Sequence, residues 1–145
     1  MSRHEIVTAP GLAPPSGYAH AVVAAPGRAV HLGGQTALGP DGRIHGETLA
    51  EQLDVAAGNV VAALRAAGCT PEDLVSVQVF VTDVDEYRAA LDELGAVWRR
   101  HFGRRYPAVG LFGVTRLFDA EAKVELMAVA VRPEPEVEPP PRRAP

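Results

Sequence analysis

The sequence predicts an α+β fold in which two helices cover one face of a mixed sheet. Residues 75–81 and 122–132 place side chains on alternate sides with a period of two, which is typical of strands. Residues 48–67 and 83–102 carry apolar side chains at three- and four-residue spacing, which is typical of amphipathic helices. Because each helix lies between two strands along the chain, as in split βαβ units, both helices are expected on the same face of one sheet.

The N-terminal part of the chain predicts an arm followed by short strands. Residues 1–17 are rich in proline and glycine, which favours an extended arm over a helix. Residues 18–25 and 28–32 have the pattern of strands separated by a turn at residues 26–27, and we expect them to pair as a hairpin. Residues 43–45 are expected to add a further short strand.

The ends of the predicted helices carry capping signals. The first helix is expected to begin at Thr48 and to end before Gly68. Residues 70–73 combine a capping threonine, a proline and two acids, which predicts a short helical turn. Asp83 and Glu86 have the spacing of a capping box at the start of the second helix.

The C-terminal part of the chain predicts two more strands and a tail. A strand over residues 108–117 is expected to lead through a loop at 118–121 to the closing strand at 122–132. Residues 133–145 alternate prolines with charges, which predicts a disordered tail because such a segment buries little apolar surface. The length of 145 residues suits one domain, which we place at residues 1–132.

The closing strand has apolar residues on both of its faces. One face carries Val124, Leu126, Ala128 and Ala130, and the other carries Lys123, Glu125, Met127, Val129 and Val131. A strand that is apolar on both sides is normally covered on both sides. Since the helices cover only one face of the sheet, the other is expected to pack against neighbouring subunits in a closed cyclic oligomer. Glu125 then either points into that covered surface or lies beside Lys123 at a solvated end of the sheet.

Composition argues against several classes of function. The formal net charge is −4 and the arginines form no basic stripe, which argues against binding of nucleic acid through its phosphates. The single cysteine, Cys69, cannot form an internal disulfide and is expected to be structural in a reducing compartment. The N-terminus has no apolar core of signal-peptide length, and no apolar run reaches about 18 residues. We therefore expect a soluble cytoplasmic protein with neither nucleic-acid nor membrane partners.

The sequence lacks the short motifs of several catalytic classes. It contains no GxxxxGK[ST] or GxGxxG phosphate loop, no HExxH zinc motif and no GxSxG nucleophile elbow. The five histidines are too far apart along the chain for a local metal site, and we expect no metal. His20 and His31 could meet across the predicted hairpin, although two strand histidines are more often structural than a zinc site.

A set of dispersed residues carries a resemblance to a known family. These are the strings Gly17–Val22, Gly34-Gln35, Asp41-Gly42, Glu51-Gln52, Ala66–Gly68, Val79–Asp83, Pro107-Ala108 and Val124-Glu125, the last followed by Ala128 and Ala130. In this order and at this spacing they resemble the RidA family, also called YjgF/YER057c/UK114. No single string is specific, but together they extend from Tyr18 to Val131, which is nearly all of the predicted domain.

The resemblance implies a homotrimer of chorismate-mutase-like α+β subunits with a ligand cleft at each subunit interface. Active members of the family hydrolyse reactive enamines and imines, such as 2-aminoacrylate, without a cofactor. Carried over by position, Tyr18 would line the cleft and Gly34 would offer a backbone group to the ligand. Glu125 would be the catalytic carboxylate that orients and deprotonates the attacking water. His20 and Gln35 are included in the expected ligand-binding set.

The sequence departs from the family at the position that anchors the substrate. Deaminating members carry an arginine directly after the Pro-Ala of the penultimate strand, where it binds the substrate carboxylate in a bidentate pair. Here Val109 and then Gly110 follow Pro-Ala, and Leu91 takes a position that is often asparagine. Three explanations follow: the ligand is more apolar and lacks a carboxylate, another cation such as Arg116 or His20 replaces the arginine, or catalysis is lost.

The sequence therefore favours a divergent RidA-like protein. We expect its interface cleft to bind a small imine, enamine or carbonyl metabolite other than 2-aminoacrylate and to hydrolyse it with Glu125 and no cofactor. The alternative is a non-catalytic trimer that binds a small molecule or a protein. Ribonuclease activity, a label sometimes attached to the family, has the least support because the chain is acidic.

Overall fold

The computed structural model describes residues 2–135 and 138–144. In chain order its elements are β1 (Glu5–Val7), β2 (Ala21–Val23), β3 (Arg28–His31), α1 (Leu49–Ala66), the 3-10 turn η1 (Pro71–Asp73), β4 (Leu74–Val81), α2 (Val84–Ala89), α3 (Leu91–Phe102), β5 (Ala108–Gly113) and β6 (Val124–Arg132).

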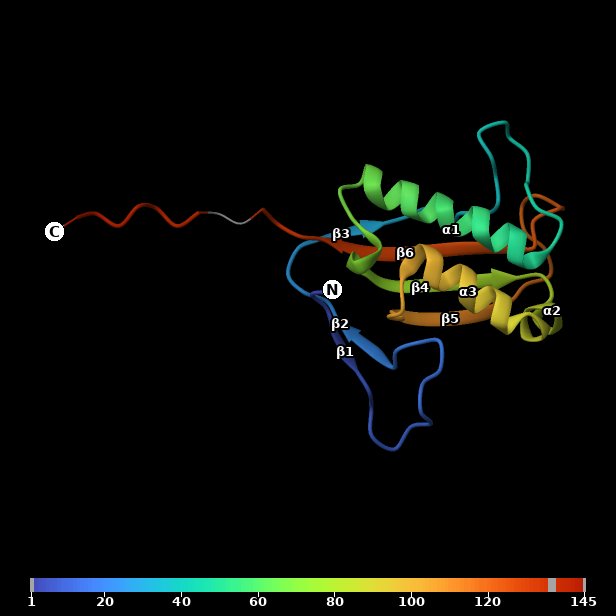
Figure 1. Ribbon diagram of the computed structural model, residues 1–145, viewed down its shortest axis with the longest axis horizontal. Coiled ribbons are helices and arrows are strands. Elements are labelled where there is room, and N and C mark those ends of the chain that lie inside the picture. Colours follow the sequence, from blue (N-terminus) through green and yellow to red (C-terminus); the bar gives the residue numbers. More distant parts are fainter. Residues whose placement is uncertain (1, 136–137, 145) are drawn as a thin grey trace.

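The core of the fold is a four-stranded mixed sheet in the order β3-β6-β4-β5. Strands β4 and β5 are parallel, whereas β6 is antiparallel to both of its neighbours. Helices α1 and α3 lie side by side across one face of this sheet, and the C-terminal segment leads away from it (Figure 1). The α+β fold class with two helices on one face of a mixed sheet, predicted from the sequence, is confirmed.

Alternating side chains of the two central strands form the centre of the core. Val79 of β4 lies opposite Leu126 of β6, and both are buried against the helices. Helix α1 contributes Leu53, Val60 and Leu64 to the same cluster. Of the two faces predicted for the last strand, the one that carries Val124, Leu126, Ala128 and Ala130 packs against the helices, because all four are buried. Burial of apolar surface of this kind is the main favourable contribution to folding.

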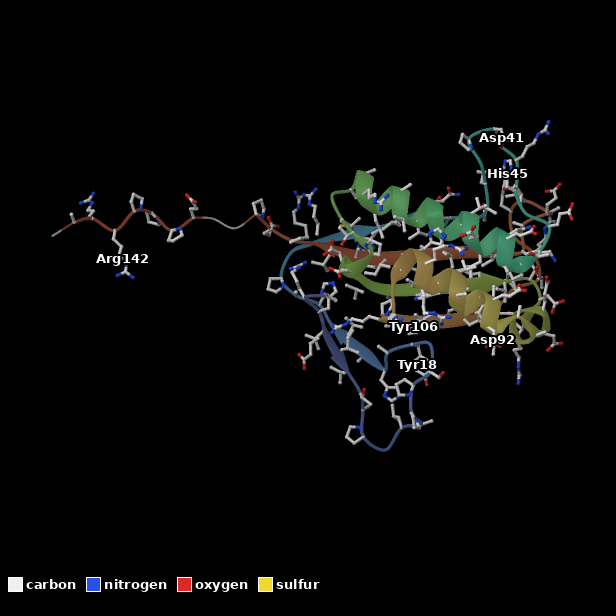
Figure 2. The ribbon with its side chains drawn as sticks, in the orientation of Figure 1. Tyr18, Asp41, His45, Asp92, Tyr106 and Arg142 are labelled. Atoms are coloured by element: carbon white, nitrogen blue, oxygen red, sulfur yellow. The ribbon has the colours of Figure 1, made fainter. Side chains whose placement is uncertain are left out.

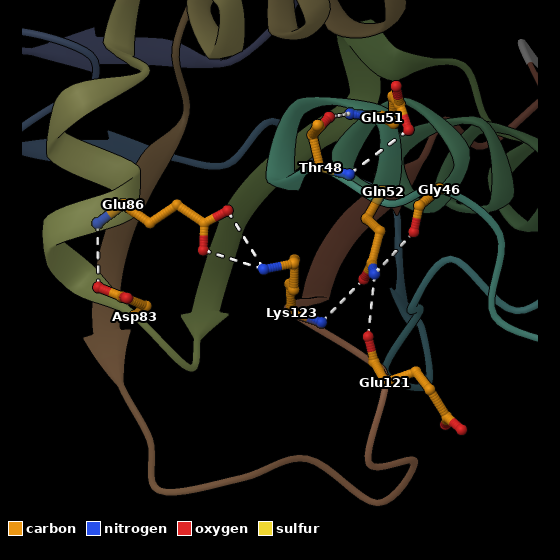
Figure 3. Close-up of polar contacts among 8 residues, drawn as sticks. All are labelled: Gly46, Thr48, Glu51, Gln52, Asp83, Glu86, Glu121 and Lys123. Atoms are coloured by element: carbon orange, nitrogen blue, oxygen red, sulfur yellow. Dashed lines mark hydrogen bonds and ion pairs between the residues drawn. The ribbon is translucent and has the colours of Figure 1, made fainter.

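A buried glutamine ties the start of α1 to the start of β6. The Gln52 side chain is 2% exposed. Its Nε2 donates to the carbonyl oxygens of Gly46, at 3.1 Å, and Glu121, at 2.9 Å, and its Oε1 accepts from the Lys123 amide at 2.8 Å (Figure 3). The side chain thus forms hydrogen bonds with three backbone groups, two carbonyls and one amide, that lie in the loops before α1 and before β6.

The predicted N-terminal hairpin is wrong. Strand β2 pairs with β1 in a separate two-stranded sheet, whereas β3 pairs with β6. The turn residue Gly27 passes so close to the end of β6 that a Cβ there would overlap the Arg132 carbonyl, so the two strands separate at this point. The predicted arm has no helix in residues 2–17 and includes strand β1. It is fixed to the body by buried His4, whose Nδ1 accepts from the Ala25 amide at 2.9 Å and whose Nε2 bonds the Asp73 carbonyl.

The second predicted helix is two helices. The backbone at Ala90 leaves helical geometry, with φ −112° and ψ 19°, and separates α2 from α3. Only half of the predicted capping box forms: Asp83 Oδ1 accepts from the Glu86 amide at 3.0 Å, while the Glu86 carboxylate pairs with Lys123 Nζ at 3.1 Å (Figure 3). The Glu86 side chain, which would complete the capping box, instead pairs with Lys123 immediately before β6.

Other predicted boundaries differ by a few residues. The strand at 43–45 is reduced to a single bridge between Leu38 and Ile44. Strand β5 ends at Gly113, and β6 begins at Val124, so the connection between them is longer than predicted. In the predicted tail, residues 133–135 and 138–144 are exposed and have no helix or strand, and the remaining tail positions lie outside the described residues.

Replacing Gln52 with leucine is expected to destabilise the fold by about 2–4 kcal/mol, because three buried backbone groups lose their partner. The measurement is chemical denaturation at one fixed protein concentration. Arg65→Gln, an exposed change on the same helix, serves as the control and should shift the free energy of unfolding by less than about 0.5 kcal/mol. Equal effects of the two variants would contradict the structural role of Gln52.

The contact between α1 and α3 should weaken in acid. Asp54 Oδ1 accepts from His101 Nε2 at 2.6 Å and Arg100 Nη2 at 2.7 Å, and these bonds lower the pKa of Asp54 below its usual value. A carboxyl group whose pKa is lower in the folded than in the unfolded state stabilises the fold at pH values above its unfolded pKa. That stabilisation is lost as the pH falls through the folded pKa. In acid denaturation, Asp54→Asn should therefore lose less stability than wild type below about pH 4; parallel curves would contradict this.

Candidate functional site

The face of the sheet opposite the helices bears an aromatic and apolar surface. Phe80 of β4 and Phe112 of β5 stack with ring centroids 5.5 Å apart. Phe112 is 45% exposed and Met127 of β6 is 48% exposed. We call this side of the four-stranded sheet the open face, because no helix of the described chain covers it. Large exposed apolar groups gathered on one sheet face are typical of a surface that another molecule covers.

Glu125 lies on the open face, half-buried and opposite Phe80 in the strand register. Gly34 lies directly against it, since a Cβ built on Gly34 would overlap the Glu125 carboxylate and lie 2.9 Å from its Cδ. The neighbouring Gln35 holds this contact in place, because its backbone exchanges two hydrogen bonds of 2.8 Å with Leu126. A larger residue at position 34 would displace the carboxylate from this position.

The Glu125 carboxylate has no hydrogen-bond or ion-pair partner among the described residues. A half-buried carboxylate normally has partners that compensate for its partial loss of water. This one instead lies free beside a backbone turn and two aromatic rings. It is available to bind a ligand or a water molecule, or to meet a group of another subunit.

A cavity of about 610 Å³ lies on the other side of the sheet, between the helical layer, strand β5 and the N-terminal arm. It brings together three residues predicted to bind ligand: Tyr18 from the arm, Leu91 from the start of α3 and Val109 from β5. In Figure 2 Tyr18 lies on the arm below the body, and Tyr106 lies just before β5. Both tyrosines line the cavity.

The cavity lining also includes aromatic residues of α2, α3 and the segment before β5 that the sequence analysis did not single out as site residues. Trp98 is 6% exposed, and its Nε1 is buried without a partner in the described part of the chain. Its ring stacks on Tyr106, with centroids 5.5 Å apart. Burial, and then the nearby Tyr106, raise the pKa of Tyr87, which keeps this cavity hydroxyl protonated. The sequence showed Trp98 only as part of a helical apolar stripe, which gives no sign of an unpaired N–H.

The predicted site residues lie on opposite faces of the sheet. Val109 packs toward the core and the cavity, whereas the next residue, Gly110, faces the other way, since a Cβ there would lie 2.9 Å from the Phe112 ring. Gly110 therefore shares the open face with Glu125, and Val109 does not. Within one subunit the carboxylate and the cavity cannot converge on one small ligand, so a combined site needs two subunits.

The remaining predicted ligand residues, His20 and Arg116, do not line the cavity, although the His20 ring lies with its centroid 5.9 Å from that of Tyr18. His20 accepts at Nδ1 from the Ala9 amide at 3.0 Å, and its Nε2 bonds the Ala13 carbonyl at 2.9 Å. Because Nδ1 accepts a hydrogen bond, Nε2 carries the ring proton, and the ring links two backbone groups within the N-terminal arm. Arg116 is exposed in the connection between β5 and β6 and has no ion pair within the described ranges. Their roles in ligand binding stay predictions.

Other chemistry has little support in the described residues. They contain no group of three or more histidine, cysteine, aspartate or glutamate residues placed to hold a metal ion. Cys69 is buried, and burial together with Asp73 raises the pKa of its thiol, which disfavours a thiolate nucleophile. No helix within residues 2–135 and 138–144 is long and apolar enough to span a membrane.

Several relatives resemble this chain over most of its length. A goat (Capra hircus) protein named 2-iminobutanoate/2-iminopropanoate deaminase is 28% identical over 133 residues, which are 91% of this chain and 92% of the goat protein. The human protein of the same name is 26% identical over 86% of this chain and 85% of its own length. A Schizosaccharomyces pombe relative, Protein mmf2, is named mitochondrial and is 37% identical over 47% of this chain and 52% of its own. The cytoplasmic location therefore stays a prediction.

Solved structures show the same fold. The Rid-family protein YyfB of Yersinia pestis, described as of unknown function, superposes with a TM-score of 0.78 at 28% identity, covering 88% of this chain and 98% of its own. The YjgF product of E. coli superposes with a TM-score of 0.64 at 30% identity, covering 74% and 83%. Residues 8–132 match the family model described as Endoribonuclease L-PSP. The chain therefore belongs to this family, the RidA/YjgF family.

Proposed function

We propose that this protein forms a homotrimer and hydrolyses a small imine or enamine in a cleft between subunits. The observation that carries the proposal is the unpartnered Glu125 carboxylate, which lies against Gly34 on an uncovered apolar sheet face. A closed cyclic assembly through the open faces would cover Phe112 and Met127. Because Glu125 lies on that face, the same assembly would place its carboxylate at the interface between subunits. The relatives named imine deaminases support the same reaction class.

The reaction needs little from the protein beyond orientation and one proton acceptor. Water adds to the electrophilic carbon of the imine C=N bond, and Glu125 accepts the proton that this water loses. This proton passes to the nitrogen and gives a carbinolamine. The carbinolamine hydroxyl then loses its proton, the nitrogen gains one, the C–N bond breaks as the C=O bond forms, and the products are a carbonyl compound and ammonia. No redox partner or cofactor is required by this balance. An enamine enters the same path after protonation at carbon gives its imine.

The departure at Val109 supports a substrate other than 2-aminoacrylate. In the structure this side chain packs against the core, where an arginine side chain would reach into the cavity. Valine offers no charge to a substrate carboxylate, but it extends the apolar wall made by Leu91, Leu94 and Leu111. The substrate is therefore a metabolite with more apolar surface than the three-carbon imino acids.

A non-catalytic trimer that binds a small molecule or a protein is the second candidate. The same valine favours it, because loss of the anchoring charge removes the group that would hold a small imino acid in a reactive pose. Phe118, which is 96% exposed in the β5–β6 connection, adds a surface group that suits a protein contact. The two candidates differ in whether Glu125 is needed for turnover.

Glu125→Gln is expected to abolish turnover and to leave assembly intact, because the amide keeps the shape but cannot accept a proton. The measurement is ammonia release from imines that an amino-acid oxidase generates from a panel of amino acids, together with the mass in solution. Glu121→Gln is the control, since the structure uses only the backbone carbonyl of that residue. Full turnover in Glu125→Gln would contradict the catalytic role, and loss of assembly would mark the residue as structural.

Val109→Arg is expected to create or raise activity on 2-iminopropanoate by about tenfold or more, because a bidentate arginine–carboxylate pair can contribute about 1.5–3 kcal/mol. The same coupled assay measures it. Thr115→Arg, in the exposed connection after β5, controls for added charge. No gain in Val109→Arg would show that the cleft differs from those of deaminating relatives at more than this residue.

A further inference from the structure

One wall of the α3–β5 cavity has a cation that neither the proposed function nor the family resemblance uses. We propose that Arg99 binds the carboxylate of a 2-imino acid whose side chain is large and apolar. This inference rests on the proposed function for the reaction, but the binding it describes is independent of turnover. It moves the anchor for the carboxylate from strand β5 to helix α3.

The position of Arg99 is the first support. Its guanidinium folds back over the preceding helical turn, where Nη1 lies 3.3 Å from a Cβ that would be built on Gly95. Both residues line the cavity, so the absence of a side chain at Gly95 leaves room for the guanidinium at this wall. Arg99 has no acidic partner in the described part of the chain, unlike Arg100, which pairs with Asp54. A free guanidinium beside a cavity suits a carboxylate ligand.

The second support is the aromatic wall beside Arg99. Trp98 borders the same cavity one residue before Arg99, and its ring stacks on that of Tyr106, which also lines the cavity. The indole N–H of Trp98 is itself buried away from solvent, so this residue offers an apolar ring to the ligand while Arg99 offers the charge.

The third support is the charge and character of the remaining wall. Among the described residues, no aspartate or glutamate lines the cavity, so none of their carboxylates competes for Arg99. The other walls are apolar and include Leu53, Val79, Val109 and Leu111. A cavity of about 610 Å³ is larger than a three-carbon acid requires, and it matches small-molecule sites in which an apolar body is buried and one polar end is fixed. The ligand class is thus a 2-imino or 2-oxo acid with a branched or longer apolar side chain.

Binding of a stable 2-oxo acid to the full-length protein tests the proposal. Trp98 is the single tryptophan of the chain, so its fluorescence reports on this cavity directly. The probes are 4-methyl-2-oxopentanoate, the smaller 2-oxopropanoate, and the uncharged 4-methylpentan-2-one. We expect saturable binding in which 4-methyl-2-oxopentanoate binds more tightly than either of the other two, because only it combines the charge with the apolar body.

The variants separate the cation from general charge effects. Arg99→Gln should weaken binding of 4-methyl-2-oxopentanoate by about tenfold or more and leave binding of the ketone unchanged, as expected for loss of a charge-assisted hydrogen bond. Arg99→Lys should restore part of the affinity, because it keeps the charge without the planar fork. Arg104→Gln removes the same charge from the loop after α3, outside this cavity, and should change affinity less than twofold.

Two results would overturn the inference: equal affinity of wild type and Arg99→Gln for the acid, or no saturable binding of the acid to wild type. Neither result bears on Glu125. Conversely, full turnover in Glu125→Gln would contradict the proposed reaction, while an acid affinity that still depends on Arg99 would leave the carboxylate site intact. The two proposals therefore fail separately.

Discussion

The antiparallel pairing of β4 with β6 is the constraint on which the rest of the molecule depends. Its register places Val79 opposite Leu126 beneath the helices and, one residue away, Phe80 opposite Glu125 on the open face. Because side chains alternate across a strand, a slip of one residue would exchange the two sets. The core would then receive a carboxylate, and the open face would lose its only acidic group on β6. Stability and the position of Glu125 are therefore set by the same backbone hydrogen bonds.

The sheet separates two features that a single small ligand would need together. On one side, Gly34 and Gln35 hold a turn against an unpartnered carboxylate. On the other, helix α3 and strand β5 enclose a cavity with a partly aromatic wall. Under the proposed function, a second subunit would have to supply the missing half of the site, and assembly would then be coupled to chemistry. The apolar open face gives a physical reason for that assembly, since Phe112 and Met127 would otherwise stay in water.

The substitution of an apolar residue at position 109 changes what holds the ligand more than what reacts with it. Glu125 keeps the geometry of a free carboxylate, while the β5 wall becomes hydrophobic and the free cation of the cavity lies on α3 at Arg99. A hydrophobic wall discriminates weakly between similar ligands, by about 1–3 kcal/mol per methylene. A charged side chain discriminates more strongly, because it favours ligands that place an opposite charge next to it. Moving the charge across the cavity would therefore alter substrate choice without altering the reaction.

The sequence by itself determined the fold class and the two-faced apolar pattern of β6, because periods of two and of three to four residues report directly on burial. The roles of Glu125, Gly34 and Tyr18 came from the resemblance to the family and stay predictions. Only the tertiary structure decided that β2 pairs with β1, that Asp83 begins a helix broken at Ala90, and that Val109 and Glu125 face opposite ways. It alone revealed the unpaired N–H of Trp98 and the free Arg99 beside it. Periodicity describes one element at a time, whereas strand partners, cavities and unsatisfied donors arise from contacts between residues far apart in the chain.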